Sequence, residues 1–389
     1  MKAPAGALRG GVGTPADVER DRRFMAAALA FGWRNQGLTW PNPSVGAILV
    51  QTIGGVPVVV GRGVTGHGGR PHAEAVAIAE AGEAARGATA YVTLEPCAHV
   101  GRGPPCADAL ITARVGRVVT AMSDPDPRVA DAGHARIAAA GIPVTTGVLA
   151  AAASLAHAGH LSRVTRFRPH VCLKFAVSAD GAIGRQGAGQ VPISGALSRA
   201  YAHVMRAEHD AILVGIGTAL ADDPQLTCRL PGMMDRTPVR VVIDAEAALP
   251  VTSFLVRSAR EHPVMVFVGS DAPPERVAAL FEAGVAIRVA DRLAGRIDLA
   301  DVLFQLSQHG LGRIMVEGGA RLAAGLLEAD LVDEAVIVRT PFVVGADPVV
   351  AFPGPTPETG PGGLVAAERR RLGDDLMTRY VRPSFLKGE

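Results

Sequence analysis

The sequence predicts an α/β protein of two domains, a layered α/β/α domain followed by a doubly wound α/β domain. With 389 residues, the chain is long enough for each half to bury its own core. Short apolar runs rich in β-branched residues alternate with helical patterns, as in mostly parallel sheets flanked by helices. We expect domains over 17–165 and 166–389, after a disordered tail over 1–16.

The composition favours an enzyme that acts on a small molecule. The formal charge is +2 and aromatic residues make up 4% of the chain, whereas nucleic-acid binders combine basic surfaces with stacking rings. Only 4 cysteines occur, which indicates a reducing compartment rather than a disulfide framework. Neither an apolar leader nor a run of membrane-spanning length is present, so we expect a cytoplasmic protein with no membrane partner.

The first domain is predicted to begin with a helix over 14–35. Thr14 suits the N-cap and Pro15 the first helical position, and apolar residues then recur at helical spacing. The elements that follow are strands over 45–50, 56–60, 90–94, 115–121 and 142–146, and helices over 72–85, 106–113, 128–140 and 148–162. This alternation predicts a mostly parallel sheet with helices on both faces.

A candidate zinc site is formed by His72, Cys97 and Cys106. Imidazole and thiolate groups suit zinc, and a catalytic site uses three protein ligands so that water keeps the fourth position. Zinc lowers the pKa of its water, and a carboxylate such as Glu74 can carry the proton to a leaving amine. The spacing is that of a zinc deaminase, except that the two cysteines lie further apart.

Two other interpretations of these residues remain. They could form a structural zinc site, or be a core histidine and two unrelated thiols. A closed structural site would require a fourth cysteine or histidine nearby and would have no use for Glu74, so the catalytic interpretation is favoured.

The segment from Thr93 to Cys106 resembles the zinc loop of the bifunctional riboflavin-biosynthesis deaminase/reductase family. The resemblance implies a cytidine-deaminase-like fold for the first domain. It also implies that His99 and Arg102, between the cysteines, help to hold a phosphoribosyl-pyrimidine. Asn42, in a Pro-Asn-Pro motif, inherits a substrate contact in the same way, the alternative being an Asx-turn residue.

The second domain is predicted to begin with the apolar strand that follows Pro169 and carries Lys174. A lysine inside an apolar strand is costly unless it meets a partner or a ligand. We therefore interpret Lys174 as a site residue, the alternative being a surface lysine. Further strands are expected before Gly215 and Gly318 and over 239–244, 264–268 and 334–339, with helices over 274–283 and 297–309.

This half resembles the reductase half of the same family, whose fold is similar to dihydrofolate reductase. The resemblance is carried by the Lys174 strand, by Gly215 to Thr218 and by Glu317-Gly318-Gly319, although the Gly-x-Gly alone is a weak dinucleotide motif. The resemblance implies that NADPH is the cofactor. It implies cofactor contacts for Ala176, Ser194, Thr218, Asp222, Gly318 and Gly319, and substrate contacts for Arg206, Leu226, Arg229 and Glu317.

Two features of the reductase half stay open at this point. Either Lys174 or Asp222 would assist protonation, and the sequence does not choose between them. Many relatives also carry Trp-Ile-Thr/Ser over the cofactor where this chain has Val191 to Ser194, so the aromatic contact is missing while a hydroxyl is kept.

The family resemblance implies a two-step enzyme of riboflavin synthesis. Zinc-dependent deamination of a diaminopyrimidine ribotide, with one zinc per chain, would be followed by NADPH-dependent reduction of its ribose, in a homo-oligomer (dimer or tetramer). One rival is a zinc nucleoside or tRNA deaminase with a non-catalytic C-terminal binding module. Another is a zinc-stabilised ligand-binding protein, which the presence of Glu74 beside three ligands disfavours.

Overall fold

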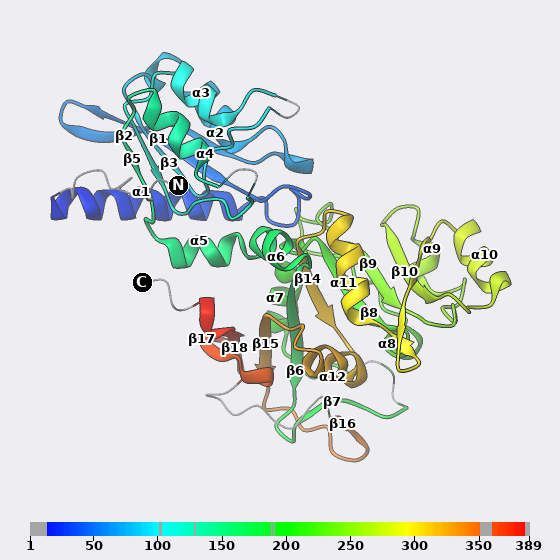
Figure 1. The fold of residues 1–389 in the computed structure, drawn as a ribbon. Coiled ribbons are helices and arrows are strands. Elements are labelled where there is room, and N and C mark those ends of the chain that lie inside the picture. The colour runs from blue at the N-terminus through cyan, green and yellow to red at the C-terminus, as the bar shows by residue number, and fades with distance from the viewer. Residues whose placement is uncertain are drawn as a thin grey trace, which may run out of the picture. The chain divides into compact units, whose positions relative to one another are not determined.

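The structure is a computed structural model (Figure 1). It describes residues 14–100, 103–127, 130–187, 189, 191–350 and 360–385. The chain divides into two compact units, the first ending at Arg166 and the second beginning at Phe167. Residues 1–13 of the expected tail lie outside the described residues, as does Arg102. The expected tail is wrong for residues 14–16, because Thr14 caps a helix that begins at Pro15.

The first unit is built on a five-stranded sheet with the strand order β2-β1-β3-β4-β5. The strands are Gly46–Ile53 (β1), Val56–Val64 (β2), Thr89–Val92 (β3), Arg117–Thr120 (β4) and Val144–Thr145 (β5). Strand β1 is antiparallel to β2 and β3, while β3, β4 and β5 are parallel. The expectation of a mostly parallel sheet is therefore wrong for β1 and β2, because the short turn at Gly54 and Gly55 joins them as a hairpin and leaves no room for a crossover helix.

The helices of the first unit are Pro15–Trp33 (α1), Ala73–Ala81 (α2), Cys106–Thr112 (α3), Ala132–Ala139 (α4), Ala150–Ala156 (α5) and Ala158–Arg166 (α6). The predicted start of α1 is confirmed, with Thr14 and Asp17 forming a capping box. Helix α2 stops short of the predicted end because Gly82 adopts φ 55° and leads into a 3-10 turn.

Two other predicted helices differ from those observed. The helix expected over 148–162 is two helices, α5 and α6, separated at His157. Of the helix expected over 128–140, residues 128 and 129 lie outside the described residues, and the regular part is α4.

Successive side chains of β1 enter two cores on opposite faces of this sheet. Ala47 and Leu49 pack with residues of α2, α3 and α4, whereas Ile48 and Val50 pack with α1 and α5. Figure 1 shows the two sets of helices on either side of the sheet. Burial on both faces explains why β1 is apolar at every position over its first half, and it produces the layered α/β/α arrangement.

The second unit contains a nine-stranded sheet with the order β11-β10-β9-β8-β14-β6-β15-β18-β17. Its strands are His170–Val177 (β6), Ala211–Gly215 (β8), Val239–Ile243 (β9), Val264–Gly269 (β10), Ala286–Ala290 (β11), Arg313–Glu317 (β14), Glu334–Arg339 (β15), Val365–Leu372 (β17) and Asp375–Val381 (β18). All pairings are parallel except those of β18 with β15 and β17. Two small pairs stand apart, Ala182–Arg185 (β7) with Pro348–Val350 (β16), and Arg292–Leu293 (β12) with Arg296–Ile297 (β13).

Helices cover both faces of the nine-stranded sheet. They are Ala196–Ala207 (α7), Ile216–Asp222 (α8), Phe254–Arg257 (α9), Pro274–Glu282 (α10), Leu299–Gln308 (α11) and Ala320–Glu328 (α12). Met315 packs with Met205 of α7, and Ile212 lies in the core that α8, α9 and α10 share. The alternating residues Ile314 and Leu213 point to the other face, where Figure 1 shows α11 and α12.

Strand β14 lies between β8 and β6, although it follows both in the sequence. The chain moves outward from β8 to β11 and then returns, which creates a switch point in the strand order. Ligands of open α/β sheets bind at such points, outside the carboxyl ends of the strands. A ligand site is therefore expected at the carboxyl ends of β6, β8 and β14.

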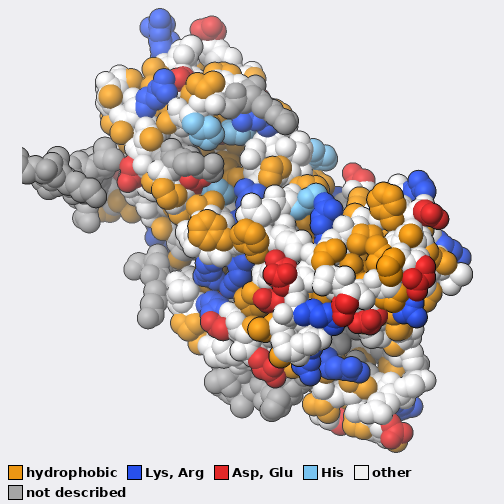
Figure 2. All heavy atoms as spheres, turned by 45° about the vertical axis from the view of Figure 1, so that its right-hand side comes forward, with side chains coloured by type: hydrophobic (Ala, Val, Ile, Leu, Met, Phe, Trp, Pro, Cys, Tyr) orange, Lys and Arg blue, Asp and Glu red, His pale blue; other side chains and the backbone are white. Residues whose placement is uncertain are grey.

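The surface and the helices add two further findings. On the face shown in Figure 2, acidic and basic side chains are interspersed among apolar ones rather than gathered into one basic patch. Within the described ranges, no helix has both the length and the apolar character needed to cross a membrane.

Candidate active sites

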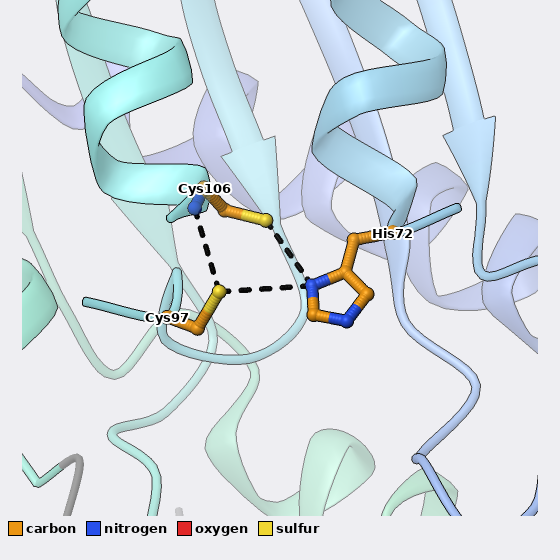
Figure 3. Close-up of side chains that lie close together, drawn as sticks. All are labelled: His72, Cys97 and Cys106. Atoms are coloured by element: carbon orange, nitrogen blue, oxygen red, sulfur yellow. Dashed lines mark hydrogen bonds between the residues drawn. The ribbon is translucent and has the colours of Figure 1, made fainter. Parts of the chain in front are cut away.

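The three predicted zinc ligands converge in the first unit (Figure 3). His72 is the N-cap of α2, Cys97 lies in the loop after β3, and Cys106 is the first residue of α3. The Nδ1 atom of His72 lies 3.2 Å from Sγ of Cys106 and 3.7 Å from Sγ of Cys97. The three donor atoms lie within 4.8 Å of one another. One nitrogen and two sulfur donors at this spacing fit a zinc ion.

Helix α2 is placed by a close approach to β2. A Cβ on Gly63 would lie 1.9 Å from the carbonyl oxygen of Ala73, and one on Gly61 would lie 2.2 Å from that of Ala77. Only glycines allow the helix backbone to rest on the strand at these positions. The contact places the first turn of α2, and with it His72 and Glu74, at the edge of the sheet where β3 ends.

The electrostatics of this site match its expected chemistry. Glu74 is buried, and this burial raises the pKa of its carboxyl group above the usual range. Hydrogen bonds from Cys106 and His72 lower the pKa of the Cys97 thiol. The hydrogen bond between the two cysteines raises the pKa of the Cys106 thiol. The lowered pKa of Cys97 favours the thiolate form in which a cysteine binds a metal.

The predicted substrate residues of this unit are partly placed. The amide nitrogen of Asn42 donates to the carbonyl oxygen of Gly69 at 2.9 Å, which holds the side chain three residues from His72 along the chain and leaves its amide oxygen as an acceptor. This bond joins two distant segments and is not the local bond of an Asx turn, and the substrate contact of Asn42 stays a prediction. His99 is exposed in the loop between the cysteines, and Arg102 lies outside the described residues.

In the second unit, three charged residues meet at the switch point. Lys174 of β6 is opposite Glu317 of β14 in the parallel register. Arg206 of α7 reaches the same carboxylate with Nη2 at 2.6 Å and Nε at 3.2 Å, and its Nη1 donates to the carbonyl oxygen of Thr227 at 3.0 Å. The side chains of Arg206 and Glu317 are each 13% exposed. Lys174 thus has the charged Glu317 as its neighbour on the adjacent strand, and its role as a site residue stays a prediction.

Burial and charge shift the pKa values of this group. Burial lowers the pKa of Lys174, with the positive charge of Arg206 acting in the same direction and Glu317 opposing both. For Glu317, burial acts to raise the pKa, but the charges of Arg206 and Lys174 prevail and lower it. The lysine is therefore a better proton donor than a free lysine, beside a carboxylate that stays ionised.

The two glycine-containing turns are packed against each other. Gly318 has φ 130°, and a Cβ there would lie 2.8 Å from Oγ1 and 2.9 Å from Cγ2 of Thr218. Gly319 is the N-cap residue of α12. The structure therefore brings Thr218, Gly318 and Gly319 together at the ends of β8 and β14, beside the Lys174 group.

The other predicted residues surround this edge of the sheet. Asp222 ends α8, and burial raises the pKa of its carboxyl group. Leu226 is buried at φ 55°, and the Arg229 guanidinium donates to Gln225 Oε1 at 2.8 Å. Positive charge on Arg206 acts, after burial, to lower the pKa of Arg229, so the two guanidinium groups share one neighbourhood.

Ser194 lies in the segment that enters α7. Its carbonyl oxygen accepts from Arg199, and the next N–H, that of Gly195, donates to Asp375 at 2.8 Å. Ile193 packs in a small cluster to which Ala176 is joined, so this segment borders the end of β6. A cavity of about 360 Å³ is lined by Ser194 and by residues of the β17–β18 turn.

Several residues at these sites were not singled out from the sequence. His203, one turn before Arg206 on α7, has Nδ1 3.1 Å from the carbonyl oxygen of Thr227 and 3.3 Å from the backbone nitrogen of Arg229. Glu95, just before Pro96-Cys97, is buried and accepts several backbone N–H groups. Its place inside the Glu-Pro-Cys motif is the one signal in the sequence that pointed to it.

Two family models match the chain. The cytidine and deoxycytidylate deaminase zinc-binding region matches residues 18–122, and the RibD C-terminal domain matches residues 169–376. These matches, together with the sheet orders, confirm the predicted fold class of a cytidine-deaminase-like unit followed by a reductase-type α/β unit.

Relatives align with nearly the whole chain. The riboflavin biosynthesis protein RibD of Escherichia coli is 35% identical over 376 residues, which cover 93% of this chain and 99% of the relative. That of Aquifex aeolicus is 36% identical over 327 residues, covering 84% and 88%. The solved structure of Acinetobacter baumannii RibD has a TM-score of 0.81 at 32% identity and covers 94% of this chain and 99% of its own. A Thermotoga maritima structure, described as a diaminohydroxyphosphoribosylaminopyrimidine deaminase/5-amino-6-(5-phosphoribosylamino)uracil reductase, has a TM-score of 0.80 at 29% identity, with coverage of 94% and 99%.

Proposed function

The chain belongs to the RibD family of bifunctional riboflavin-biosynthesis enzymes, and from this membership we propose how its residues divide the two reactions. It is a zinc-binding deaminase joined to a reductase. The rival function, a nucleoside or tRNA deaminase with a non-catalytic C-terminal module, is not favoured, because a reductase family model covers the second unit.

For the deaminase we assign the zinc ligands to His72, Cys97 and Cys106, and the observation that carries this assignment is the convergence of their donor atoms. When bound, zinc acidifies a water molecule and so supplies a nucleophile at neutral pH. Glu74 would take the proton of this water and deliver it to the leaving amine. Its raised pKa suits a group that must both accept and return a proton.

The substrate we propose for this step is 2,5-diamino-6-(5-phosphoribosylamino)pyrimidin-4-one. The support is the description of the Thermotoga maritima relative. Asn42, His99 and Arg102 would contact the substrate, with the amide oxygen of Asn42 facing a donor of the pyrimidine. Water would replace the amino group on the ring carbon, and ammonia would leave.

For the reductase we propose that NADPH reduces the ribose of the deaminated product to a ribityl chain. When bound, NADPH supplies the hydride. Thr218, Gly318, Gly319, Ala176, Ser194 and Asp222 would contact this cofactor, while Arg206, Leu226, Arg229 and Glu317 would contact the substrate. Guanidinium groups suit a ribose phosphate, and Arg229 is the one not held by Glu317.

Of the two candidate proton donors, we assign the role to Lys174. Opening the ribose requires a proton on the ring oxygen as hydride reaches the neighbouring carbon. Lys174 is held beside Glu317 and Arg206, and its pKa is lowered by burial, so it can release a proton near neutral pH. The one observation that supports Asp222 as the proton donor is that burial raises the pKa of its carboxyl group.

We place the enzyme in the cytoplasm, as its cysteine usage suggests, and expect a homo-oligomer, a dimer or a tetramer, which light scattering would measure.

The test of the proposed function separates the two reactions. Zinc-loaded protein is incubated with the diaminopyrimidine ribotide, with and without NADPH, while ammonia release and NADPH oxidation are followed independently. We expect ammonia in both reactions and NADPH oxidation only after deamination. Ammonia without NADPH oxidation would refute the reductase assignment, and absence of ammonia would refute the substrate.

A further inference from the structure

A buried carboxylate lies two residues before a zinc ligand with all of its acceptor capacity in use. Oε2 of Glu95 accepts the N–H groups of Asp124 at 3.1 Å and Asp131 at 3.0 Å, and Oε1 accepts those of Gly133 at 2.9 Å and His134 at 3.2 Å. A carboxylate offers about four lone-pair sites, and four donors occupy them here. Glu95 thereby ties the end of β3 to the turn after β4 and to the start of α4.

Helix α4 also lies against the backbone that leads to Cys97. A Cβ on Gly133, in the first turn of α4, would lie 1.9 Å from the carbonyl oxygen of Pro96. The position therefore requires glycine, and the helix cannot shift toward the strand end. The path of the chain into Cys97 is thus set on one side by the Glu95 carboxylate and on the other by this contact.

A second charged residue links α4 to both cysteine-bearing segments. Nη1 of Arg136 donates to the carbonyl oxygen of Ala98 at 3.1 Å, and its Nε lies 2.6 Å from Oδ1 of Asp108. Ala98 follows Cys97, and Asp108 lies two residues after Cys106 on α3. The two segments are also joined directly, because the Cys106 N–H points to the Cys97 sulfur at 3.4 Å.

Glu95, Asp131 and His134 lie within 4.8 Å of one another, yet they do not form a second metal site. Both oxygens of Glu95 face backbone N–H groups, whose positive ends would repel a cation. Because its acceptor sites are all occupied, the Glu95 carboxylate holds the backbone in place rather than a metal ion.

We propose that Glu95 and Arg136 are positioning residues of the zinc site, which through α4 set the spacing of the Cys97 and Cys106 thiols. The inference rests on the proposed zinc ligands and goes beyond them, because neither residue is among those ligands or among the proposed substrate contacts. Fixing the two segments in advance reduces the ordering that metal binding must bring about, so it raises the affinity for zinc.

The decisive variant is Glu95→Gln. Its amide nitrogen would face two backbone N–H groups in place of an acceptor, which loosens one half of the contact while the side-chain size is kept. We expect the affinity for zinc, measured by competition with a coloured chelator, to fall about 10-fold to 100-fold. In the cobalt-substituted protein, the thiolate-to-cobalt absorption bands should shift, because they report the angles at the metal.

The matched control is Glu80→Gln. Glu80 also accepts a backbone N–H, that of Arg62 at 2.6 Å, but its side chain is 41% exposed and lies at the other end of α2 from His72. This variant should bind zinc as the unmodified protein does. It separates the position of Glu95 from the chemistry of the substitution.

A second variant, Arg136→Gln, keeps the test informative if Glu95→Gln fails to fold. The Arg136 side chain is 47% exposed, so its replacement leaves the core intact, and losing its contacts should weaken zinc binding by about 3-fold to 10-fold. Arg62→Gln, which breaks the exposed pair with Glu80, is its control.

The outcomes distinguish this inference from the function on which it rests. Weaker zinc binding and shifted cobalt bands in Glu95→Gln and Arg136→Gln, but not in their controls, support it. Variants that melt at a lower temperature yet keep zinc affinity and cobalt bands overturn it, because Glu95 and Arg136 would then serve the fold alone. An unmodified protein that binds no zinc would overturn the proposed deaminase site itself.

Discussion

Replacing Gly318 with alanine should disable the reductase while leaving the deaminase active. Gly318 lies in the turn between β14 and α12, at φ 130°, facing Thr218. The substitution adds one methyl group at the point where the two glycine-containing turns meet. The deaminase residues lie in the other compact unit, so ammonia release by the same protein is an internal control.

The cost of this substitution has two separable parts. A non-glycine residue at such a positive φ costs about 1–3 kcal/mol in backbone strain. The added Cβ, 2.8 Å from Oγ1 and 2.9 Å from Cγ2 of Thr218, must displace that side chain, and overpacking of this kind costs about 1–3 kcal/mol more. If the turn forms part of the cofactor site, its displacement removes contacts with NADPH, and a loss of about 1.4 kcal/mol or more, out of this total of about 2–6 kcal/mol, weakens NADPH binding at least 10-fold.

The assay measures NADPH affinity by fluorescence and NADPH oxidation with deaminated substrate, in both Thr218 and Thr218→Ala backgrounds. Alanine at 218 removes Oγ1 and Cγ2, the two atoms nearest the new methyl group. It relieves the steric part of the cost and leaves the backbone strain. Gly318→Ala should therefore weaken NADPH binding less in the Thr218→Ala background than in the unmodified one.

Two results would refute this reasoning. NADPH affinity unchanged in Gly318→Ala would show that the turn does not contact the cofactor. An equal loss in both backgrounds would show that the Thr218 contact contributes nothing and that backbone strain alone explains the effect.

Further expectations concern proton transfer, metal and acid stability. Glu74→Gln should retain zinc and lose ammonia release by about 100-fold or more, and full activity would exclude Glu74 as the proton carrier. Lys174→Met should abolish NADPH oxidation while ammonia release continues, whereas the reverse pattern would contradict the assignment of Lys174 to the second unit's chemistry. Removing zinc with a chelator should stop ammonia release but leave reduction of deaminated substrate intact. As the control, adding zinc back should restore ammonia release. Arg168 holds Asp333 ionised against the effect of burial, so the pKa of Asp333 falls from 3.8 to about 2. The stabilisation that ionised Asp333 gives the folded state is complete above pH 3.8 and is lost as the pH falls through about 2. In Asp333→Asn, the free energy of unfolding, measured by circular dichroism, should therefore depend less on pH over this range.

The convergence of the three proposed zinc ligands was predictable because their chemistry is local. Residue type and spacing alone indicated a metal site at His72, Cys97 and Cys106. The fold brings these residues together. The role of Glu95 was not predictable, because its four hydrogen bonds depend on where the turn after β4 and the start of α4 lie. No pattern near Glu95 encodes that position.

The second unit shows the same contrast. The glycines of the two turns were visible as motifs, but the pairing of Arg206 with Glu317 joins a helix to a strand 111 residues later. Only the placement of β14 between β8 and β6 makes these side chains neighbours. The sequence indicated that β1 and β2 are partner strands, but an alternation of strands and helices implies parallel pairing and did not reveal that β1 is also antiparallel to β3.

The insertion of β14 between two earlier strands has a consequence for synthesis of the chain. His72 and Cys106 are 34 residues apart, so the deaminase site can assemble soon after that segment leaves the ribosome. Arg206 cannot pair with Glu317 until residue 317 has been made, and the sheet is incomplete between β8 and β6 until β14 has been made. Contacts between distant segments form slowly, so the nascent chain should acquire its two activities in the order in which the pathway uses them.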